Sequence, residues 1–263
     1  VCMIRKWFII ASILLVVFSG LCAAEEVLRV GATPVPHGDI LLQVVPLLAE
    51  QGIKLEIIEF TDYILPNIAL NDGEIDANFF QHVPYLQTFN QDHRMNLVAV
   101  ANIHIEPLGL YSKKVASVSE LPKNATIAIP NDPTNGGRAL LLLQSAGLIK
   151  VDPKAGITPT IFDVIENKMN LRFVEIEAAQ LARTLDDTTA AIINGNYALL
   201  AGLVPTQDAI FLEGADSPYV NVLAVRADRA DDPKIQKLAE VLRSDVVRDF
   251  ILNQYNGSVV PVF

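Results

Sequence analysis

Short β-rich runs alternate with helical patterns from Val27 to Tyr255, and no low-complexity linker interrupts them. Apolar and β-branched runs predict strands over residues 27–31, 54–60, 75–79, 97–105, 126–130, 171–176, 190–193 and 219–226. Apolar residues at spacings of three and four predict helices over residues 39–51, 63–70, 84–93, 134–146, 233–243 and 245–255. This alternation predicts an α/β fold with mainly parallel sheets.

The composition is that of a protein with a large core. The chain has 263 residues, of which 51% are apolar, and this excludes intrinsic disorder as the global state. The formal charge of −10 argues against a nucleic-acid binder, because phosphate contacts need clustered Lys and Arg. Two cysteines, Cys2 and Cys22, lie near the N-terminus, so the body of the chain has no disulfide scaffold, cysteine-based zinc site or catalytic cysteine.

The first 24 residues have the pattern of a targeting segment. Arg5 and Lys6 precede the uncharged stretch 7–24, which is almost wholly apolar between residues 8 and 21. A short basic region, an apolar run and small residues together describe a secretory signal peptide. The run also reaches the lower limit for spanning a bilayer, so a retained anchor helix is an alternative. We expect residues 1–24 to direct export.

Two processing routes are compatible with this segment. Cleavage after Ala24 leaves small residues at the two recognition positions. Alternatively, Ser19-Gly20-Leu21-Cys22 resembles a bacterial lipoprotein box with Cys22 as the lipidated, palmitate-bearing residue, although Leu21 departs from the small residue usual at its position. Lipidation explains why a cysteine stands at the end of the signal. We therefore expect a periplasmic protein that is anchored to the membrane through Cys22.

Polar residues gather at the carboxyl ends of predicted strands, in the segments 60–63, 78–85, 131–138 and 194–197. In open α/β sheets, ligands bind at that edge. The segment 131–138 is the most informative. Thr134 or Asn135 can cap the helix that begins there, Gly136 and Gly137 allow close approach of a ligand, and Arg138 suits a carboxylate. The segment therefore predicts an anion site, with a capped helix and a surface arginine as the alternative.

Aromatic and imidazole side chains offer a second set of candidates. Phe80, His82 and Tyr85, joined by Tyr63, can form an aromatic wall, or they can belong to the core. The four histidines lack the i, i+4 pairing of a helical metal site, so we expect no metal. The chain has no Gly-x-Ser-x-Gly, phosphate-loop or dinucleotide-binding motif, and no spacing singles out an acid–base pair. The sequence therefore predicts a protein without a cofactor that is not an enzyme.

Five ordered motifs resemble one family. They are Phe60-Thr-Asp-Tyr63, Phe80-Gln-His-Val-Pro-Tyr85, His104-Ile-Glu-Pro-Leu-Gly-Leu-Tyr-Ser112, Ile129-Pro-Asn-Asp-Pro-Thr-Asn-Gly-Gly-Arg-Ala-Leu140 and Asn194-Gly-Asn-Tyr-Ala198. The chain resembles the NlpA-type lipoproteins, the methionine-binding lipoproteins of bacterial methionine ABC importers, from about Leu28 to Phe263. The resemblance implies a two-lobed periplasmic-binding-protein fold of type II, with two crossovers and a ligand cleft between the lobes. By analogy, lobe I holds residues 27–106 plus 220–263, and lobe II holds residues 107–219.

The resemblance also implies roles for individual residues. Arg138 would bind the ligand carboxylate, and Asn135 would help to orient the amino-acid head. Asn194, together with Asn196, would bind the amino and carboxylate groups from a second direction. The pocket for the thioether would be lined by Tyr63, Phe80, His82 and Tyr85, since a polarizable thioether packs well on aromatic edges. His104, beside the first crossover, would face the cleft.

The resemblance implies a monomeric binding protein that delivers L-methionine to the permease and ATPase subunits of an ABC importer. Three alternatives stay open at this point. The same scaffold can be tuned to another small amino acid or a short peptide, the chain can be an exported enzyme on an α/β scaffold, or it can be a surface adhesin or antigen.

Overall fold

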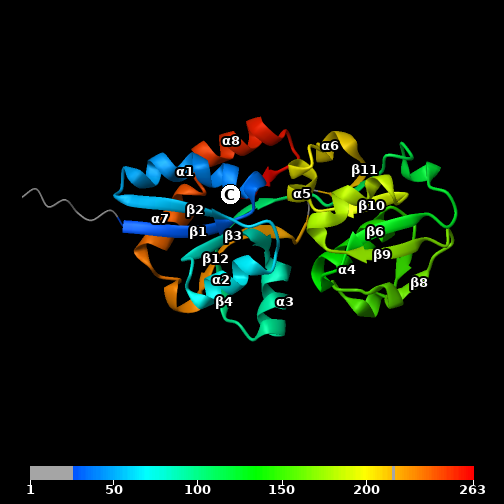
Figure 1. Cartoon of the computed structure of the whole chain (residues 1–263), viewed down its shortest axis with the longest axis horizontal. Coiled ribbons are helices and arrows are strands. Elements are labelled where there is room, and N and C mark those ends of the chain that lie inside the picture. Colours follow the sequence, from blue (N-terminus) through cyan, green and yellow to red (C-terminus); the bar gives the residue numbers. More distant parts are fainter. Residues whose placement is uncertain (1–25, 215–216) are drawn as a thin grey trace, which may run out of the picture.

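Two mixed β-sheets, each covered by helices, lie side by side along the long axis of the molecule (Figure 1). The computed structural model describes residues 26–214 and 217–263, so the predicted signal segment 1–24 and Cys22 lie outside the described residues. The two-lobed α/β architecture that the sequence predicts is confirmed. The described helices include none that is long and apolar enough to cross a bilayer.

The first sheet has the strand order β13–β4–β12–β3–β1–β2. Its strands are β1 (Glu26–Ala32), β2 (Ile53–Glu59), β3 (Ala77–His82), β4 (Leu97–Ile105), β12 (Val220–Arg226) and β13 (Val260–Pro261). One face packs against the helices α1 (Asp39–Ala49), α7 (Pro233–Val241) and α8 (Asp245–Tyr255). The other face packs against α2 (Leu65–Asp72) and α3 (Val83–His93).

The second sheet has the order β11–β5–β10–β6–β9. Its strands are β5 (Gly109–Tyr111), β6 (Thr126–Pro130), β9 (Arg172–Ile176), β10 (Ala190–Ile193) and β11 (Ala209–Leu212). Helix α4 (Pro133–Ser145) covers one face, and the 3-10 helix η5 (Ala178–Asp186) and α5 (Gly195–Leu200) cover the other. The remaining elements are α6 (Pro205–Asp208), β7 (Lys150–Val151), β8 (Val164–Glu166), η1 (Pro34–Gly38), η2 (Val118–Glu120), η3 (Pro153–Ala155), η4 (Ile161–Asp163) and η6 (Ala227–Arg229).

The alternation of side chains along β6 explains why this strand reads as a continuous apolar run. Ile127 and Ile129 pack in the same cluster as Leu140 and Leu143 of α4, whereas Ala128 packs with Leu181 of η5 on the opposite face. Both faces of the strand are therefore buried, as in other α/β sheets that carry helices on both sides.

The expectation of mainly parallel sheets is wrong. The pairs β1/β2, β1/β3, β6/β9 and β6/β10 are parallel, but β12 runs antiparallel to β3 and β4, and β5 runs antiparallel to β10 and β11. The chain passes between the sheets after β4 and again after β11. The parallel pairs are the ones that a crossover helix can join, whereas β5 and β12 enter their sheets directly from the opposite lobe.

Candidate functional site

A cavity lies where the two lobes meet and encloses an empty volume of about 330 Å³. The structure brings eight of the nine predicted site residues together in its lining: Tyr63, Phe80, His82, Tyr85, Asn135, Arg138, Asn194 and Asn196. Tyr63 follows β2, Phe80 and His82 lie at the end of β3, and Tyr85 lies in the first turn of α3. The last four come from the segments after β6 and β10.

Helix α4 begins with a side-chain cap. The Asp132 carboxylate, and not Thr134 or Asn135, caps the helix, because Asp132 Oδ1 accepts the backbone N–H of Asn135 at 2.9 Å. The side chain of Asn135 donates to both Asp132 oxygens at 3.0 Å. The Asn135 amide is thereby fixed, and its Oδ1 is turned to accept bonds from His82 and Asn194.

The glycine pair in this helix serves packing within the chain and not the close approach of a ligand. A Cβ on Gly136 would lie 2.9 Å from the carbonyl oxygen of Pro130. A Cβ on Gly137 would lie 2.7 Å from Thr158 Cα and 3.0 Å from the carbonyl oxygen of Ile157. The glycines therefore let α4 approach β6 and the 157–158 loop, and this approach sets the position of Arg138.

Replacing Gly137 with alanine should destabilise the protein by about 1–3 kcal/mol, because the new methyl group meets backbone atoms that cannot move independently. Thermal unfolding of the purified variant measures the loss. Gly214→Ala is the matched control, since a Cβ there has nothing within 4 Å and the backbone does not have a positive φ. Equal melting temperatures for the wild type and Gly137→Ala would contradict the packing role.

Arg138 is the buried cation of the cavity, with only 3% of its surface exposed. Its Nε donates to Glu213 Oε1 at 3.0 Å, and its Nη2 donates to Glu213 Oε2 and, at 2.8 Å, to the carbonyl oxygen of Glu106. The guanidinium also lies 4.2 Å from the centre of the Tyr219 ring. These three partners belong to the two segments that join the lobes, so Arg138 is fixed by both connections. The Nη1 end of the guanidinium is the end that these contacts leave available to a ligand.

A chain of hydrogen bonds crosses the cavity from His82 to Asn194. The Nδ1 of His82 accepts the backbone N–H of Tyr85 at 3.1 Å, so the ring proton lies on Nε2 and is donated to Asn135 Oδ1 at 3.1 Å. The same oxygen accepts Asn194 Nδ2 at 2.8 Å. Burial, reinforced by the charge of Arg138, lowers the pKa of His82 to about 3. The imidazole is therefore neutral near pH 7, and it acts as a hydrogen-bond group and not as a cation.

One acceptor in the cavity lacks a partner. Asn194 Oδ1 is buried and receives no hydrogen bond from a described residue. An unpaired buried oxygen costs roughly 1–3 kcal/mol, so a site of this kind favours a ligand that brings a donor. An ammonium group is such a donor.

Aromatic rings form part of the cavity lining. The Tyr63 ring lies 5.9 Å from Phe80 and 5.8 Å from Tyr85, and the rings of Phe80 and Tyr85 are 6.1 Å apart, all measured between centroids. Phe89 packs 5.8 Å behind Tyr85 and does not line the cavity. The aromatic residues therefore form a small core cluster and also part of the cavity wall. Both alternatives that the sequence left open, an aromatic wall and a core cluster, apply to them.

Hydrogen bonds between the lobes hold the cavity closed. The Tyr63 hydroxyl donates to Asn196 Oδ1 at 2.6 Å, and the Tyr197 hydroxyl donates to the carbonyl oxygen of Thr61 at 3.1 Å. The bond between His82 and Asn135 also joins residues that follow different sheets. Most of the lining side chains are accordingly buried.

His104 is the predicted residue that the structure places elsewhere. Its ring is fully buried and does not line the cavity, because it lies behind Glu106 and contacts that carboxylate through Nε2 at 2.8 Å. Glu106, which the sequence analysis did not select, lines the cavity instead. Burial raises the pKa of the Glu106 carboxyl, while His37, the backbone N–H of Asn196 and Arg138 act in the opposite direction.

The cavity lining also includes Gln81, Gly195 and Asn221, and Glu213 pairs with Arg138. The sequence patterns predicted none of these four residues. Gln81 lies in the motif 80–85 and Gly195 lies in the motif 194–198. The predicted site residues beside them were the signal that could have identified both. Asn221 and Glu213 lie in or beside the second connection between the lobes, and no local pattern marks them.

A closed cavity between two lobes, with a buried arginine, several amides and an aromatic wall, defines a two-lobed solute-binding protein. The chain belongs to the NlpA lipoprotein family, whose model matches residues 28–263. The relatives of this chain are named as binding proteins and lipoproteins, and the prediction that the protein is not an enzyme is confirmed.

Three relatives illustrate the similarity. The D-methionine-binding lipoprotein MetQ of Escherichia coli K12 is 47% identical over 211 residues, which is 80% of this chain and 78% of that protein. The membrane lipoprotein TpN32 of Treponema pallidum is 42% identical over 236 residues, covering 90% of this chain and 88% of that protein. A nutrient-binding protein from Burkholderia cenocepacia, solved bound to methionine, has a TM-score of 0.88 and 44% identity, covering 90% of this chain and 100% of that one.

Proposed function

We propose that this protein captures L-methionine in the cavity between its lobes and delivers it to an ABC importer. The observation that carries the proposal is the cavity lining, which combines the buried Arg138 and the unpartnered Asn194 Oδ1 with aromatic rings. An α-amino acid needs a cation for its carboxylate and acceptors for its ammonium group, and a thioether needs an apolar, polarizable surface. The family and its methionine-binding relatives support the same ligand.

In this proposal, the ligand carboxylate binds to the Nη1 end of Arg138, because Glu213 and the Glu106 carbonyl engage Nε and Nη2. Asn194 Oδ1 accepts a hydrogen bond from the ligand ammonium group. Asn135 and Asn196 hold the polar part of the lining in place. Asn135 accepts a hydrogen bond from His82, and Asn196 accepts one from Tyr63. The thioether lies against the rings of Tyr63, Phe80, His82 and Tyr85.

The test begins with the compound that the protein carries. We expect denaturation of the purified protein to release methionine in a near one-to-one ratio, identified by mass spectrometry. The emptied, refolded protein should then bind L-methionine in calorimetry. The D enantiomer is titrated in parallel, because the E. coli relative is named for it. Release of a different compound would keep the binding role and change its ligand, whereas failure to bind any amino acid would refute the proposal.

Tyr85→Ala should weaken binding of methionine more than binding of alanine, because the ring lines the part of the cavity assigned to the thioether. Loss of a buried aromatic contact of this type costs about 0.5–1.5 kcal/mol beyond area burial, so the ratio of the two affinities should change by about two- to tenfold. Calorimetric titration with both ligands measures the ratio. Phe89→Ala is the matched control, since it removes a ring from the same cluster that does not face the cavity, and it should leave the ratio unchanged.

We further propose that residues 27–106 plus 220–263 form lobe I and that residues 107–219 form lobe II. The membership of the two sheets supports this division. We also propose that the protein is exported, works as a monomer with the permease and ATPase subunits of an importer, and is anchored through a lipid on Cys22. Metabolic labelling with palmitate should mark the wild type, and Cys22→Ser should abolish the label and release the protein from the membrane.

A further inference from the structure

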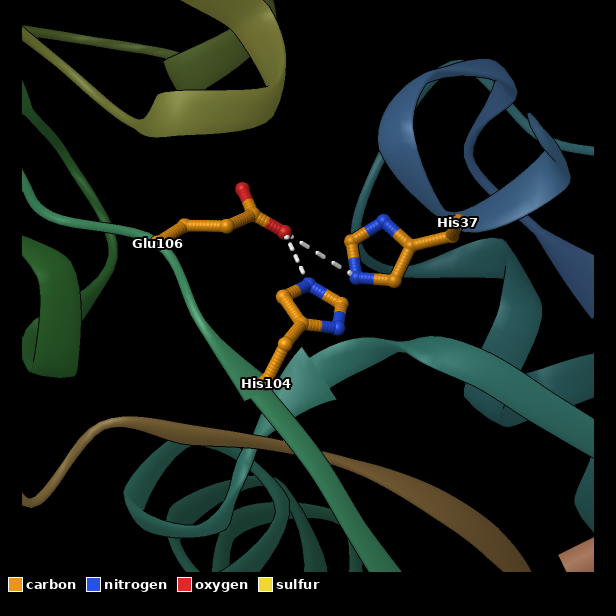
Figure 2. Close-up of side chains that lie close together, drawn as sticks. All are labelled: His37, His104 and Glu106. Atoms are coloured by element: carbon orange, nitrogen blue, oxygen red, sulfur yellow. Dashed lines mark hydrogen bonds and ion pairs between the residues drawn. The ribbon is translucent and has the colours of Figure 1, made fainter. Parts of the chain in front are cut away.

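Two histidines converge on one carboxylate at the edge of the cavity. Figure 2 shows His37 and His104 pointing toward the same oxygen of Glu106. His104 Nε2 lies 2.8 Å and His37 Nε2 lies 3.3 Å from Glu106 Oε1. The exposed fractions of these three residues are 1% for His37, 0% for His104 and 5% for Glu106. They are therefore removed from solvent, and Glu106 is the member that reaches the cavity.

The surrounding contacts set the direction of the hydrogen bonds. The Nδ1 of His37 lies 2.7 Å from Thr33 Oγ1, and its Nε2 faces two acceptors, Glu106 Oε1 and Asn221 Oδ1, the latter at 3.1 Å. The proton of a neutral His37 therefore lies on Nε2, and the hydroxyl of Thr33 donates to Nδ1. By the same reasoning, the proton of His104 lies on the nitrogen that faces the carboxylate. Burial keeps both imidazoles neutral, since it lowers the pKa of His37 to about 4 and that of His104 to about 3.

The second oxygen of Glu106 is directed differently. Oε2 points away from both imidazole rings (Figure 2) and lies 3.1 Å from the position that a Cβ of Gly195 would take. Gly195 follows Asn194, whose unpartnered Oδ1 belongs to the same cavity. Two oxygen acceptors, one on a carboxylate and one on an amide, thus lie at neighbouring positions of the lining. Arg138, the cation, is also close, because its Nη2 contacts the carbonyl oxygen of Glu106 at 2.8 Å.

We propose that Glu106 is the counter-charge for the α-ammonium group of the bound amino acid and that His37 and His104 are positioning residues for it. By donating to Oε1, His104 stabilises the charged carboxylate. The Nε2–H of His37, which lies 3.3 Å from the same oxygen, adds to this effect, and both rings leave Oε2 to the ligand. This inference rests on the proposed function and deepens it: the cavity then presents one anion and one cation at adjacent positions, which selects zwitterionic α-amino acids over carboxylic acids or amines alone.

A carboxylate in this position needs such support. Removal from water favours the neutral form of a carboxyl group, whereas hydrogen bonds donated to the charged form oppose that effect. The N–H donor of His104, the nearby Nε2–H of His37, the Asn196 backbone N–H and the guanidinium of Arg138 supply this opposition. Neutral imidazoles do so without adding a positive charge that would repel the ligand ammonium group.

The same three side chains have donor atoms close enough to hold a metal ion. Two contacts favour hydrogen bonding instead. The 2.8 Å separation of His104 Nε2 and Glu106 Oε1 is that of a direct hydrogen bond. A metal-bound imidazole usually donates its other N–H to an acceptor, but no described group contacts the buried Nδ1 of His104. Metal binding is therefore an outcome that the experiment must distinguish.

The experiment compares L-methionine with 4-(methylthio)butanoate, which lacks the ammonium group and keeps the carboxylate and thioether. Glu106→Gln should weaken L-methionine binding by about tenfold to a hundredfold, the range for a lost charged hydrogen bond, and leave the deaminated compound within about threefold. His104→Leu should show the same pattern, because it removes the donor. His104→Gln is the matched variant, since its side-chain amide can donate in place of Nε2, and it should retain most of the discrimination. Thermal melts show that each variant is folded.

Several results would overturn the inference. Equal losses for both compounds in Glu106→Gln would give Glu106 a structural role only, and equal defects in His104→Gln and His104→Leu would remove the positioning role. Stoichiometric Zn²⁺ binding by the wild type that is abolished in His104→Gln would identify a metal site instead. A wild-type protein that does not bind methionine would refute the proposed function and this inference together, whereas normal wild-type binding with unchanged discrimination in the variants would refute the inference alone.

Discussion

Replacing Arg138 with alanine should weaken methionine binding by about 30-fold to several-thousand-fold, the result of losing one partner of a desolvated charged pair at roughly 2–5 kcal/mol. The guanidinium is the buried cation of the cavity lining, and a ligand carboxylate that enters without it gives up its hydration for no equivalent partner. The variant also leaves Glu213 without its bidentate partner. Calorimetric titration with L-methionine measures the loss of affinity, and a thermal melt records the separate loss of stability.

Arg248→Ala is the matched control for this experiment. Arg248 likewise pairs with a carboxylate, on Asp245, donates to a backbone carbonyl, that of Phe263, and lies 5.2 Å from the centre of an aromatic ring. It does not line the cavity. We expect this control to change stability and not affinity. Unchanged affinity in Arg138→Ala would show that the ligand carboxylate binds elsewhere.

Acidification from pH 7 to pH 5 should destabilise the protein, in the absence of ligand, by an amount on the order of 3–6 kcal/mol. Burial lowers the pKa of His37 to about 4 and those of His82 and His104 to about 3, against 6.5 for an ordinary histidine. At pH values between the folded and the unfolded pKa, the unfolded chain binds protons that the folded protein does not bind. The free energy of unfolding therefore falls as the pH falls, by up to about 1.4 kcal/mol per pH unit for each histidine. The raised pKa of Glu106 acts in the opposite direction and offsets part of the loss.

Thermal melts at pH 7, 6 and 5 measure this effect, which should lower the melting temperature by roughly 10–20 °C for a chain of this size. His82→Asn removes one of the three titrating groups while its side-chain oxygen can still cap α3, so the acid-induced loss should shrink by about a third. His93→Asn, on an exposed histidine, should leave the loss unchanged. A melting temperature that does not depend on pH over this range would refute the burial argument.

The sequence predicted the elements and the two-lobed architecture because local patterns and ordered motifs carry that information. Eight of the nine predicted residues lie in one cavity lining for the same reason: polar segments such as residues 80–85 lie at strand ends, and the strand ends of an α/β sheet meet at one edge. Strand direction was not predictable in the same way. β5 and β12 enter their sheets from the opposite lobe, and nothing in their own residues records that path.

The lining and pairing residues that the sequence did not predict share a location in the fold. Glu106, Glu213 and Asn221 lie in or beside the two connections between the lobes, where a side chain acquires its role only when both lobes are in place. His104 illustrates the converse case, a predicted site residue that does not line the cavity. Its motif marked it correctly as a residue near the cleft, but spacing does not reveal that Glu106, two residues later, occupies the cavity edge in front of it.

The hydrogen bonds between Tyr63 and Asn196, Tyr197 and Thr61, and His82 and Asn135 have a consequence for kinetics. A molecule enclosed behind them leaves only after the lobes separate, so its residence time is governed by the opening rate as well as by its own contacts. Two ligands of different affinity can then share one dissociation rate and differ mainly in how fast they are captured. A transporter that pulls these three bonds apart would empty the cavity without having to recognise what it holds.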